Sequence, residues 1–90
     1  MFAIFFNTHA QDDLLLIPKT NQRRIELSIK KKLCKYPELF GVKLRGSLRD
    51  YWKLRVGDYR VGYVVREKTI IILAIKHRKE IYRILERRIR

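Results

Sequence analysis

The sequence is poor in the residues that cross-link small domains or bind metals. It holds one cysteine, Cys34, and two histidines, His9 and His77, among 90 residues. A single cysteine cannot form an internal disulfide, which suits a reducing cytoplasm. Neither a paired Cys-x-x-Cys nor a His-Glu-x-x-His zinc motif is present, and the nine acidic residues are dispersed. We therefore expect a cytoplasmic protein that uses no metal and no cofactor.

Long apolar runs and glycine-rich loops are missing as well. No apolar stretch approaches the roughly 20 residues needed to span a bilayer, and the apolar residues 1–6 lack the basic leader and cleavage site of a signal peptide. The two serines lack the strand–turn context of a hydrolase nucleophile. The four glycines are too scattered to form a phosphate-binding loop: Gly41, Gly46, Gly57 and Gly62.

Basic residues, by contrast, are abundant. Lys and Arg number 22 against 9 acidic residues, which gives a formal net charge of +13. Residues 41–90 hold 15 basic and 5 acidic side chains, net +10, whereas residues 1–40 hold 7 and 4, net +3. This balance predicts a polyanionic partner, with nucleic acid ahead of an anionic membrane. The length and the 47% hydrophobic content predict one folded domain over residues 1–90.

The first part of the chain predicts a strand followed by a helical hairpin. Residues 2–6 are bulky and β-prone, so we expect a central strand there. Thr8 is expected to cap a helix over residues 10–16, and Pro18 separates this helix from a second one that ends at Tyr36. The second helix carries one apolar face with helical spacing: Ile25, Ile29, Leu33 and Tyr36.

After Gly46 the hydrophobic period changes to two. Three strands joined by tight turns are expected there: residues 48–56, 59–67 and 69–77. Residues 79–90 predict a short terminal helix. Residues 70–75 are apolar on both faces, so the terminal helix or a partner chain must cover the second face. The predicted fold is α+β, in the order β-α-α-β-β-β-α, with a four-stranded, mainly antiparallel sheet under the helical hairpin.

A two-residue turn at residues 57–58 sets the register of the central hairpin. Arg55 then lies opposite Arg60, and Lys53 lies opposite Gly62. Like charges opposite one another cost a sheet a few tenths to about 1 kcal/mol, and the glycine leaves space beside Lys53. This face therefore predicts a phosphate site, with a solvated face of splayed side chains as the alternative. The other face is apolar and is expected to meet the helices: Trp52, Leu54, Val56, Tyr59, Val61 and Tyr63.

Lys, Arg, Tyr and His around a phosphate-sized space can cleave RNA without a metal. The 2′-hydroxyl of RNA is an internal nucleophile already placed beside the scissile phosphate. The protein must supply a base for this hydroxyl, cations for the charge that develops on the phosphate, and an acid for the leaving oxygen. DNA lacks the 2′-hydroxyl and would not react by this route.

Three strings of residues carry a resemblance to a known family: Lys43-Leu-Arg-Gly-Ser, Tyr51-Trp-Lys-Leu-Arg-Val-Gly-Asp-Tyr-Arg-Val-Gly-Tyr and Ile72-Leu-Ala-Ile-Lys-His-Arg-Lys-Glu-Ile-Tyr82. Over nearly its whole length the chain resembles the RelE/ParE toxin superfamily, and the RelE branch most closely. The resemblance implies a RelE-like fold and a toxin of a type II toxin–antitoxin pair. RelE toxins enter the 30S A site of the ribosome and cleave the mRNA there, leaving a 2′,3′-cyclic phosphate. An mRNA interferase that inhibits translation is therefore implied.

The resemblance also assigns roles by position. Lys53 and Arg55 occupy the two basic strand positions from which the base is drawn. Arg60 matches the arginine that stabilises the phosphate. Tyr82 matches the tyrosine that orients the nucleotide or stacks on it.

The remaining basic residues have less definite roles in this resemblance. Arg78 lies in the C-terminal basic string, whose arginine is a proposed acid or transition-state clamp in relatives. The spacing there varies, so Lys76 or His77 could hold that role instead. Lys43 and Arg45 are expected to contact the RNA backbone.

Residues 83–90 depart from the matched pattern as a basic extension past Tyr82, which could shift that tyrosine or serve as an antitoxin dock. Two alternatives to the nuclease stay open: a ParE-like inhibitor of DNA gyrase, which shares the scaffold and does not cleave RNA, and a catalytically idle RNA-binding relic. The basic residues together with Tyr82 favour RelE. The +13 charge and the leftover apolar strand positions predict an acidic, RelB-like antitoxin, partly helical and folding as it binds.

Overall fold

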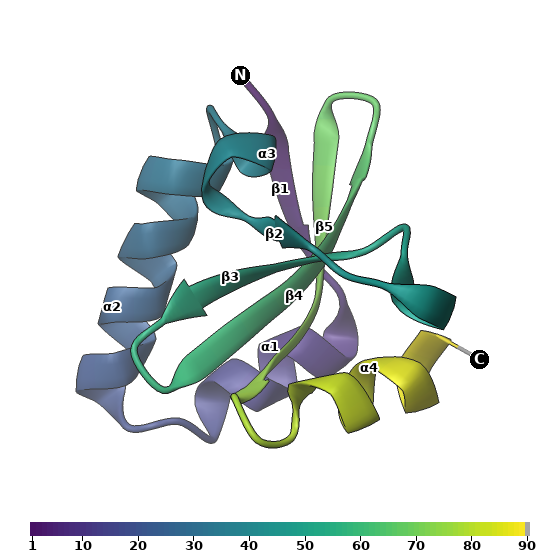
Figure 1. Ribbon diagram of the computed structural model, residues 1–90. Coiled ribbons are helices and arrows are strands. Elements are labelled where there is room, and N and C mark those ends of the chain that lie inside the picture. The colour runs from purple at the N-terminus through teal and green to yellow at the C-terminus, as the bar shows by residue number, and fades with distance from the viewer. Residues whose placement is uncertain (90) are drawn as a thin grey trace.

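The chain folds into a five-stranded sheet with helices on both of its faces (Figure 1). The computed structural model describes residues 1–89. The elements follow in this order: β1 (Ala3–Phe6), α1 (Thr8–Leu15), α2 (Lys19–Ser28), the π-helical turn η1 (Ile29–Leu33), α3 (Pro37–Phe40), β2 (Val42–Lys43), the 3₁₀ turn η2 (Gly46–Leu48), β3 (Trp52–Val56), β4 (Tyr59–Arg66), β5 (Thr69–His77) and α4 (Ile81–Ile89). The predicted α+β class is confirmed.

The strand order is β1-β5-β4-β3-β2, with β1 parallel to β5 and the other pairs antiparallel. The expectation of a central first strand is wrong, because β1 lies at an edge. Ile4 and Phe6 pack on the core, while Phe5 between them is 58% exposed. The sheet also has one strand more than predicted, since Val42–Lys43 pairs with the start of β3.

The helical hairpin follows the predicted pattern, although its second helix ends with η1 at Leu33 and not at Tyr36, and an unpredicted short helix, α3, follows. Its cap and its apolar face also differ from the prediction. Asn7, one residue before the expected Thr8, caps α1: its side-chain oxygen accepts a hydrogen bond from Ala10 N at 2.9 Å. In the second helix Ile25, Ile29 and Leu33 are buried as predicted, whereas Tyr36 is 54% exposed. The π-helical turn η1 widens the last turn, which rotates Tyr36 out of the apolar seam.

The central hairpin has the predicted register. Arg55 pairs with Arg60, and Lys53 pairs with Gly62. The strand before the turn starts at Trp52 rather than at residue 48, because residues 46–48 form η2. The last strand spans Thr69–His77, as predicted. A bulge between Gly62 and Tyr63 shifts its register against β4.

Two apolar cores lie on the two faces of the sheet. The larger core joins the sheet to α1, α2 and η1, and the smaller joins it to α4 through Ala74, Ile81 and Leu85. The terminal helix therefore covers the second face of β4 and β5. It begins at Ile81, two residues later than predicted, and Arg90, the last residue of the predicted helix, lies outside the described residues.

Candidate nucleic-acid interface

A pocket of about 450 Å³ opens where β2, the loop after it, β3 and α4 meet. Four of the predicted site residues line it: Lys43, Arg45, Lys53 and Tyr82. Apolar walls come from Val42, Leu44 and Leu48, and Glu86 is the acidic residue in the lining. Segments up to about forty residues apart in sequence thus bring basic groups and an aromatic ring to one cavity.

Lys53 and Tyr82 are in direct contact in this pocket. The Lys53 ammonium donates a hydrogen bond to the Tyr82 hydroxyl, and its nitrogen lies 4.9 Å from the ring centroid. Lys43 is held over the Trp52 ring, at 5.8 Å. The Tyr82 side chain stays partly exposed. An anion can therefore meet Lys53 beside an aromatic ring that is open to a base.

A row of cations crosses the sheet next to Lys53. Arg55, Arg60 and Lys76 are cross-strand neighbours on β3, β4 and β5, and Arg55 shares the face of Lys53 at a spacing of about 6.6 Å along the strand. The Arg60 guanidinium donates to Gly57 O at 2.9 Å and to Tyr59 O at 3.0 Å, so it points toward the hairpin turn. Lys76 forms an ion pair with Asp13 at 3.2 Å.

His77 and Arg78 lie at the end of β5 and outside the pocket. His77 pairs with Tyr59, whose ring it meets edge-on at 6.3 Å between centroids. Strand alternation therefore puts His77 on the opposite face from Lys53, and its Nδ1 accepts a hydrogen bond from Lys79 N at 3.2 Å. Arg78 is exposed beside the hairpin turn, where its backbone N–H donates to Asp58 O at 2.8 Å.

The predicted space beside Lys53 is occupied by protein. A Cβ placed on Gly62 would lie 2.8 Å from Leu85 Cδ2 and 2.9 Å from Leu85 Cδ1. The prediction that this glycine makes room for a phosphate is therefore wrong: it makes room for α4. The pocket formed by Lys43, Arg45, Lys53 and Tyr82 lies to the side of that contact.

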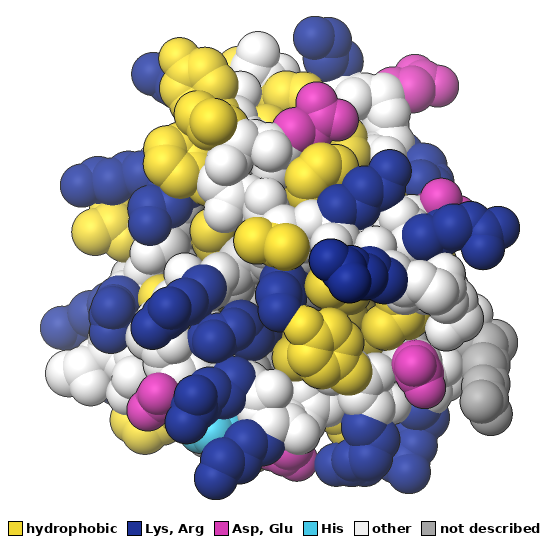
Figure 2. All heavy atoms as spheres, in the orientation of Figure 1, with side chains coloured by type: hydrophobic (Ala, Val, Ile, Leu, Met, Phe, Trp, Pro, Cys, Tyr) yellow, Lys and Arg dark blue, Asp and Glu magenta, His cyan; other side chains and the backbone are white. Residues whose placement is uncertain are grey.

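Positive charge dominates this side of the molecule. Figure 2 shows dark blue Lys and Arg side chains spread over the region where Figure 1 places β3, β4 and α4, with few magenta Asp or Glu side chains among them. Within residues 1–89 no three His, Cys, Asp or Glu side chains gather as a metal-binding group would. No helix in that range is long and apolar enough to cross a membrane.

Comparison with known proteins places this geometry in a family. Residues 4–82 match the family described as ParE toxin of type II toxin-antitoxin system, parDE. The chain belongs to the RelE/ParE family of type II toxins. Toxin RelE3 of Methanocaldococcus jannaschii is 32% identical to it over 87 residues, which cover 91% of this chain and 96% of that protein.

Solved structures agree with this assignment to the toxin family. The RelBE2 toxin–antitoxin complex of Mycobacterium tuberculosis superposes with a TM-score of 0.81 at 28% identity, covering 86% of this chain and 91% of that one. The RelB–RelE complex of Methanococcus jannaschii gives 0.67 at 31% identity, covering 88% and 95%. The expected RelE-like fold is confirmed, and both of these related toxins were solved together with an antitoxin.

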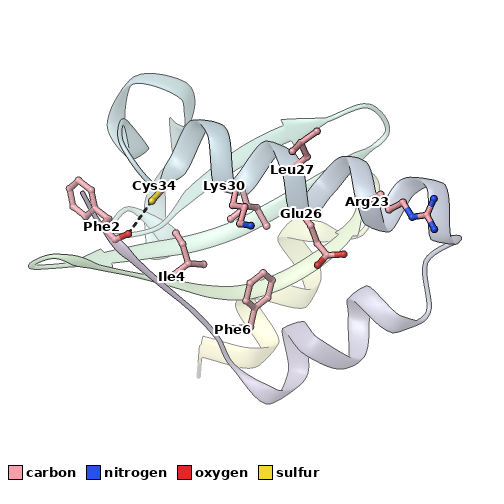
Figure 3. Close-up of a pocket in the computed structure, with 9 residues that line it drawn as sticks. Phe2, Ile4, Phe6, Arg23, Glu26, Leu27, Lys30 and Cys34 are labelled. Carbon is pink, nitrogen blue, oxygen red and sulfur yellow. Dashed lines mark hydrogen bonds between the residues drawn. The ribbon is translucent and has the colours of Figure 1, made fainter.

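A second cavity of this toxin lies far from the basic residues singled out by the sequence. It is an apolar groove of about 630 Å³ between β1 and α2. Figure 3 shows Phe2, Ile4 and Phe6 along one wall and residues of α2, Leu27 among them, along the other. Cys34 closes one end, where its Sγ donates to Phe2 O at 3.3 Å.

Sequence reasoning missed a buried carboxylate next to the site. Asp13 is 4% exposed and accepts hydrogen bonds from both terminal nitrogens of Arg88, at 2.7 and 2.9 Å, and from Ile75 N at 2.9 Å. Burial alone would raise the pKa of Asp13, but the hydrogen bonds and charges of Arg88 and Lys76, with the Ile75 N–H, bring it below its ordinary value. A signal was present: Asp13 stands three residues after Ala10 and four before Ile17, on the buried side of α1 and the turn that follows it.

Proposed function

We propose that this toxin is a ribosome-dependent mRNA endonuclease that needs no metal and inhibits translation by cleaving mRNA in the A site. The observation that carries the proposal is the contact of Lys53 with Tyr82 in a pocket flanked by Lys43 and Arg45. This combination can hold a phosphate and stack a base at the same time. The identity to toxin RelE3 supports the RelE branch.

In the proposed reaction the 2′-hydroxyl attacks the adjacent phosphorus and the P–O5′ bond breaks. The products are a 2′,3′-cyclic phosphate and a free 5′-hydroxyl. The base that takes the 2′-hydroxyl proton is drawn from Lys53 and Arg55, and Arg60 stabilises the charge on the five-coordinate phosphate. Tyr82 stacks on the nucleotide or orients it.

The acid that protonates the 5′ oxygen is drawn from Lys76, His77 and Arg78. The geometry favours Lys76 or Arg78, because strand alternation directs His77 to the face opposite Lys53. Lys76 shares the face of Arg60 and is its cross-strand neighbour. Lys43 and Arg45 bind the backbone of the RNA at the pocket rim.

Cleavage by the purified toxin in a translating ribosome reaction tests this proposal. We expect cuts at codon positions with cyclic-phosphate ends on ribosome-bound mRNA. Ribosome-free RNA, treated with EDTA and incubated with the same toxin, should stay intact. Arg60→Ala and Tyr82→Ala should abolish cleavage and growth arrest while the fold survives. Arg66→Ala is the matched control, since it removes an exposed arginine from the far end of the same strand.

Two results would count against the proposal. Unchanged growth arrest from both site variants would refute the residue assignment. A folded toxin that leaves ribosome-bound mRNA intact and inhibits DNA supercoiling would instead establish the ParE-like activity, which the matched family description keeps as the second candidate.

We also propose an acidic, RelB-like antitoxin as the partner of this toxin, with the apolar groove between β1 and α2 as its binding site. The groove is walled by Phe2, Ile4 and Phe6, and its charged lining residues are Arg23, Lys30 and Glu26. Two cations against one carboxylate suit an amphipathic helix with acidic flanks. The two solved relatives described above are antitoxin complexes.

A charge introduced at the groove tests this binding site. Leu27→Glu changes an exposed side chain of the groove wall and should weaken antitoxin binding, as measured by calorimetry. Leu39→Glu alters a leucine on α3 that is also exposed and lies outside the groove, and it should leave binding unchanged. Equal affinities for the two variants would place the antitoxin elsewhere.

A further inference from the structure

The first half of β5 (residues 69–72) has a strand neighbour on each side, whereas its second half (residues 73–77) has β4 alone. β1 pairs with β5 only from Thr69 to Ile72. Beyond Ile72 two side chains bind the backbone groups of β5 that have no strand partner. Asp13 accepts a hydrogen bond from Ile75 N at 2.9 Å, and Arg88 donates one to Leu73 O at 3.1 Å. A carboxylate from α1 and a guanidinium from α4 therefore stand where a further strand would bind.

These two side chains are also bound to each other. Arg88 donates through both terminal nitrogens to both oxygens of Asp13, at 2.7 and 2.9 Å. Such a two-pronged contact fixes orientation as well as distance. Lys76, one end of the cationic row, is drawn to the same carboxylate at 3.2 Å.

The spacing along α4 links this contact to the candidate site. Tyr82, Leu85 and Arg88 are three residues apart, so on a helix Leu85 lies between the other two, about 60° from each. Leu85 packs onto Gly62 of β4. Tyr82 then faces Lys53 on the β3 side, and Arg88 faces Asp13 on the β5 side. The helix rests on an apolar ridge with one polar contact on each flank.

We propose that Asp13 is a positioning residue of the site: its carboxylate fixes the roll of α4 through Arg88 and so holds Tyr82 against Lys53. If the contact on the β5 flank is removed, α4 is free to turn about the Leu85 ridge and Tyr82 moves away from Lys53. The placement of Tyr82 is independent of the activity, whereas the consequence for cleavage rests on the proposed function.

The position of Tyr82 can be followed by fluorine NMR of toxin labelled with 3-fluorotyrosine, with its resonance assigned by Tyr82→Phe. Asp13→Asn keeps an oxygen for Ile75 N but removes the charge, and Arg88→Gln removes the other partner. We expect each to shift the Tyr82 resonance and to speed hydrogen exchange of the α4 amides by about tenfold or more. The variant with both substitutions should show no larger resonance shift and no faster exchange than either single variant, because both changes remove the same contact. Asp12→Asn and Arg87→Gln, exposed neighbours with the same charge changes, should do neither.

A Tyr82 resonance that does not move would overturn the proposal. Hydrogen exchange that rises equally in α4 and in the β3–β4 hairpin would also overturn it, because it would mean a purely global loss of stability. Should Asp13→Asn not fold, Arg88→Lys keeps the charge without the two-pronged contact and gives the same comparison. In the ribosome assay, Asp13→Asn and Arg88→Gln should lower kcat by the same factor with KM unchanged. If the native toxin does not cleave, the proposed function fails while the NMR result still decides the role of Asp13.

Discussion

Gly62→Ala is the substitution that best separates the two explanations of the glycine beside Lys53. If the glycine made room for a phosphate, alanine would weaken RNA binding at unchanged stability. If it makes room for α4, alanine must destabilise the fold, because the added Cβ would lie 2.8, 2.9 and 3.2 Å from three carbons of the buried Leu85.

The size of the effect follows from this contact. Overpacking a filled core by one methyl group costs about 1–3 kcal/mol, and Leu85→Ala alone should cost about 2–5 kcal/mol because it leaves a cavity. In the double variant the new methyl enters the space that Leu85 vacates. The overpacking penalty then disappears, so the double variant should be more stable than the sum of the two single costs predicts, by about 1–3 kcal/mol.

Urea unfolding followed by circular dichroism and by the fluorescence of Trp52 measures all four proteins of this cycle. Equal m-values would show that the changes lie in stability and not in the unfolded chain. Effects that add within about 0.5 kcal/mol would refute the packing argument. A stable Gly62→Ala variant with lost RNA binding would restore the phosphate explanation.

Three further predictions concern stability. Because the pKa of Asp13 in the folded protein lies below its ordinary value of 3.8, its ionised form stabilises the fold above that pH, and this contribution is lost as the pH falls through the folded pKa. The difference in urea stability between the native and Asp13→Asn proteins should therefore shrink in acid. A difference that stays constant would exclude the ionic contribution. Burial raises the pKa of Tyr63, so its hydroxyl stays a donor to Pro37 O at 2.6 Å; Tyr63→Phe should cost about 1 kcal/mol in urea unfolding, and no loss would mean that water replaces the bond. Asn7→Ala should cost about 0.5–2 kcal/mol through the lost cap, whereas Thr8→Ala should be nearly neutral, and the reverse order of melting temperatures would restore Thr8 as the cap.

The parts of the fold that local chemistry decides were predictable from the sequence. A two-residue turn leaves one register for its hairpin, and the pairing of Arg55 with Arg60 followed from it. The edge position of β1 was not predictable, because a run of bulky residues is typical both of a strand with one neighbour and of a strand with two. In the structure β1 pairs with β5 alone, which makes it an edge strand. The exposed Phe5 between two packed residues shows in addition that one of its faces is uncovered, and only the assembled sheet reveals either fact.

The candidate site divides in the same way. Lys53 and Tyr82 were singled out from the sequence, and the structure brings them into contact; their catalytic roles stay predictions. The space beside Gly62 was misassigned because a glycine between cations fits either a ligand or a helix, and the sequence does not say where α4 docks. Asp13 was missed because its partners Ile75 and Arg88 lie 62 and 75 residues away along the chain.

The contact between Lys53 and Tyr82 depends on the stability of α4. A nine-residue helix is marginal by itself in water, so α4 (Ile81–Ile89) depends on what it touches. Ile81 and Leu85 bury its apolar side on the sheet, and Arg88 binds Asp13. Tyr82 stands on this helix and contacts Lys53, and under the positioning role proposed for Asp13 it does so only while those contacts hold. Any change that loosens α4 therefore dismantles the Lys53–Tyr82 pair before the rest of the sheet unfolds, and substitutions as distant as Asp13 should affect the pocket as strongly as changes within it.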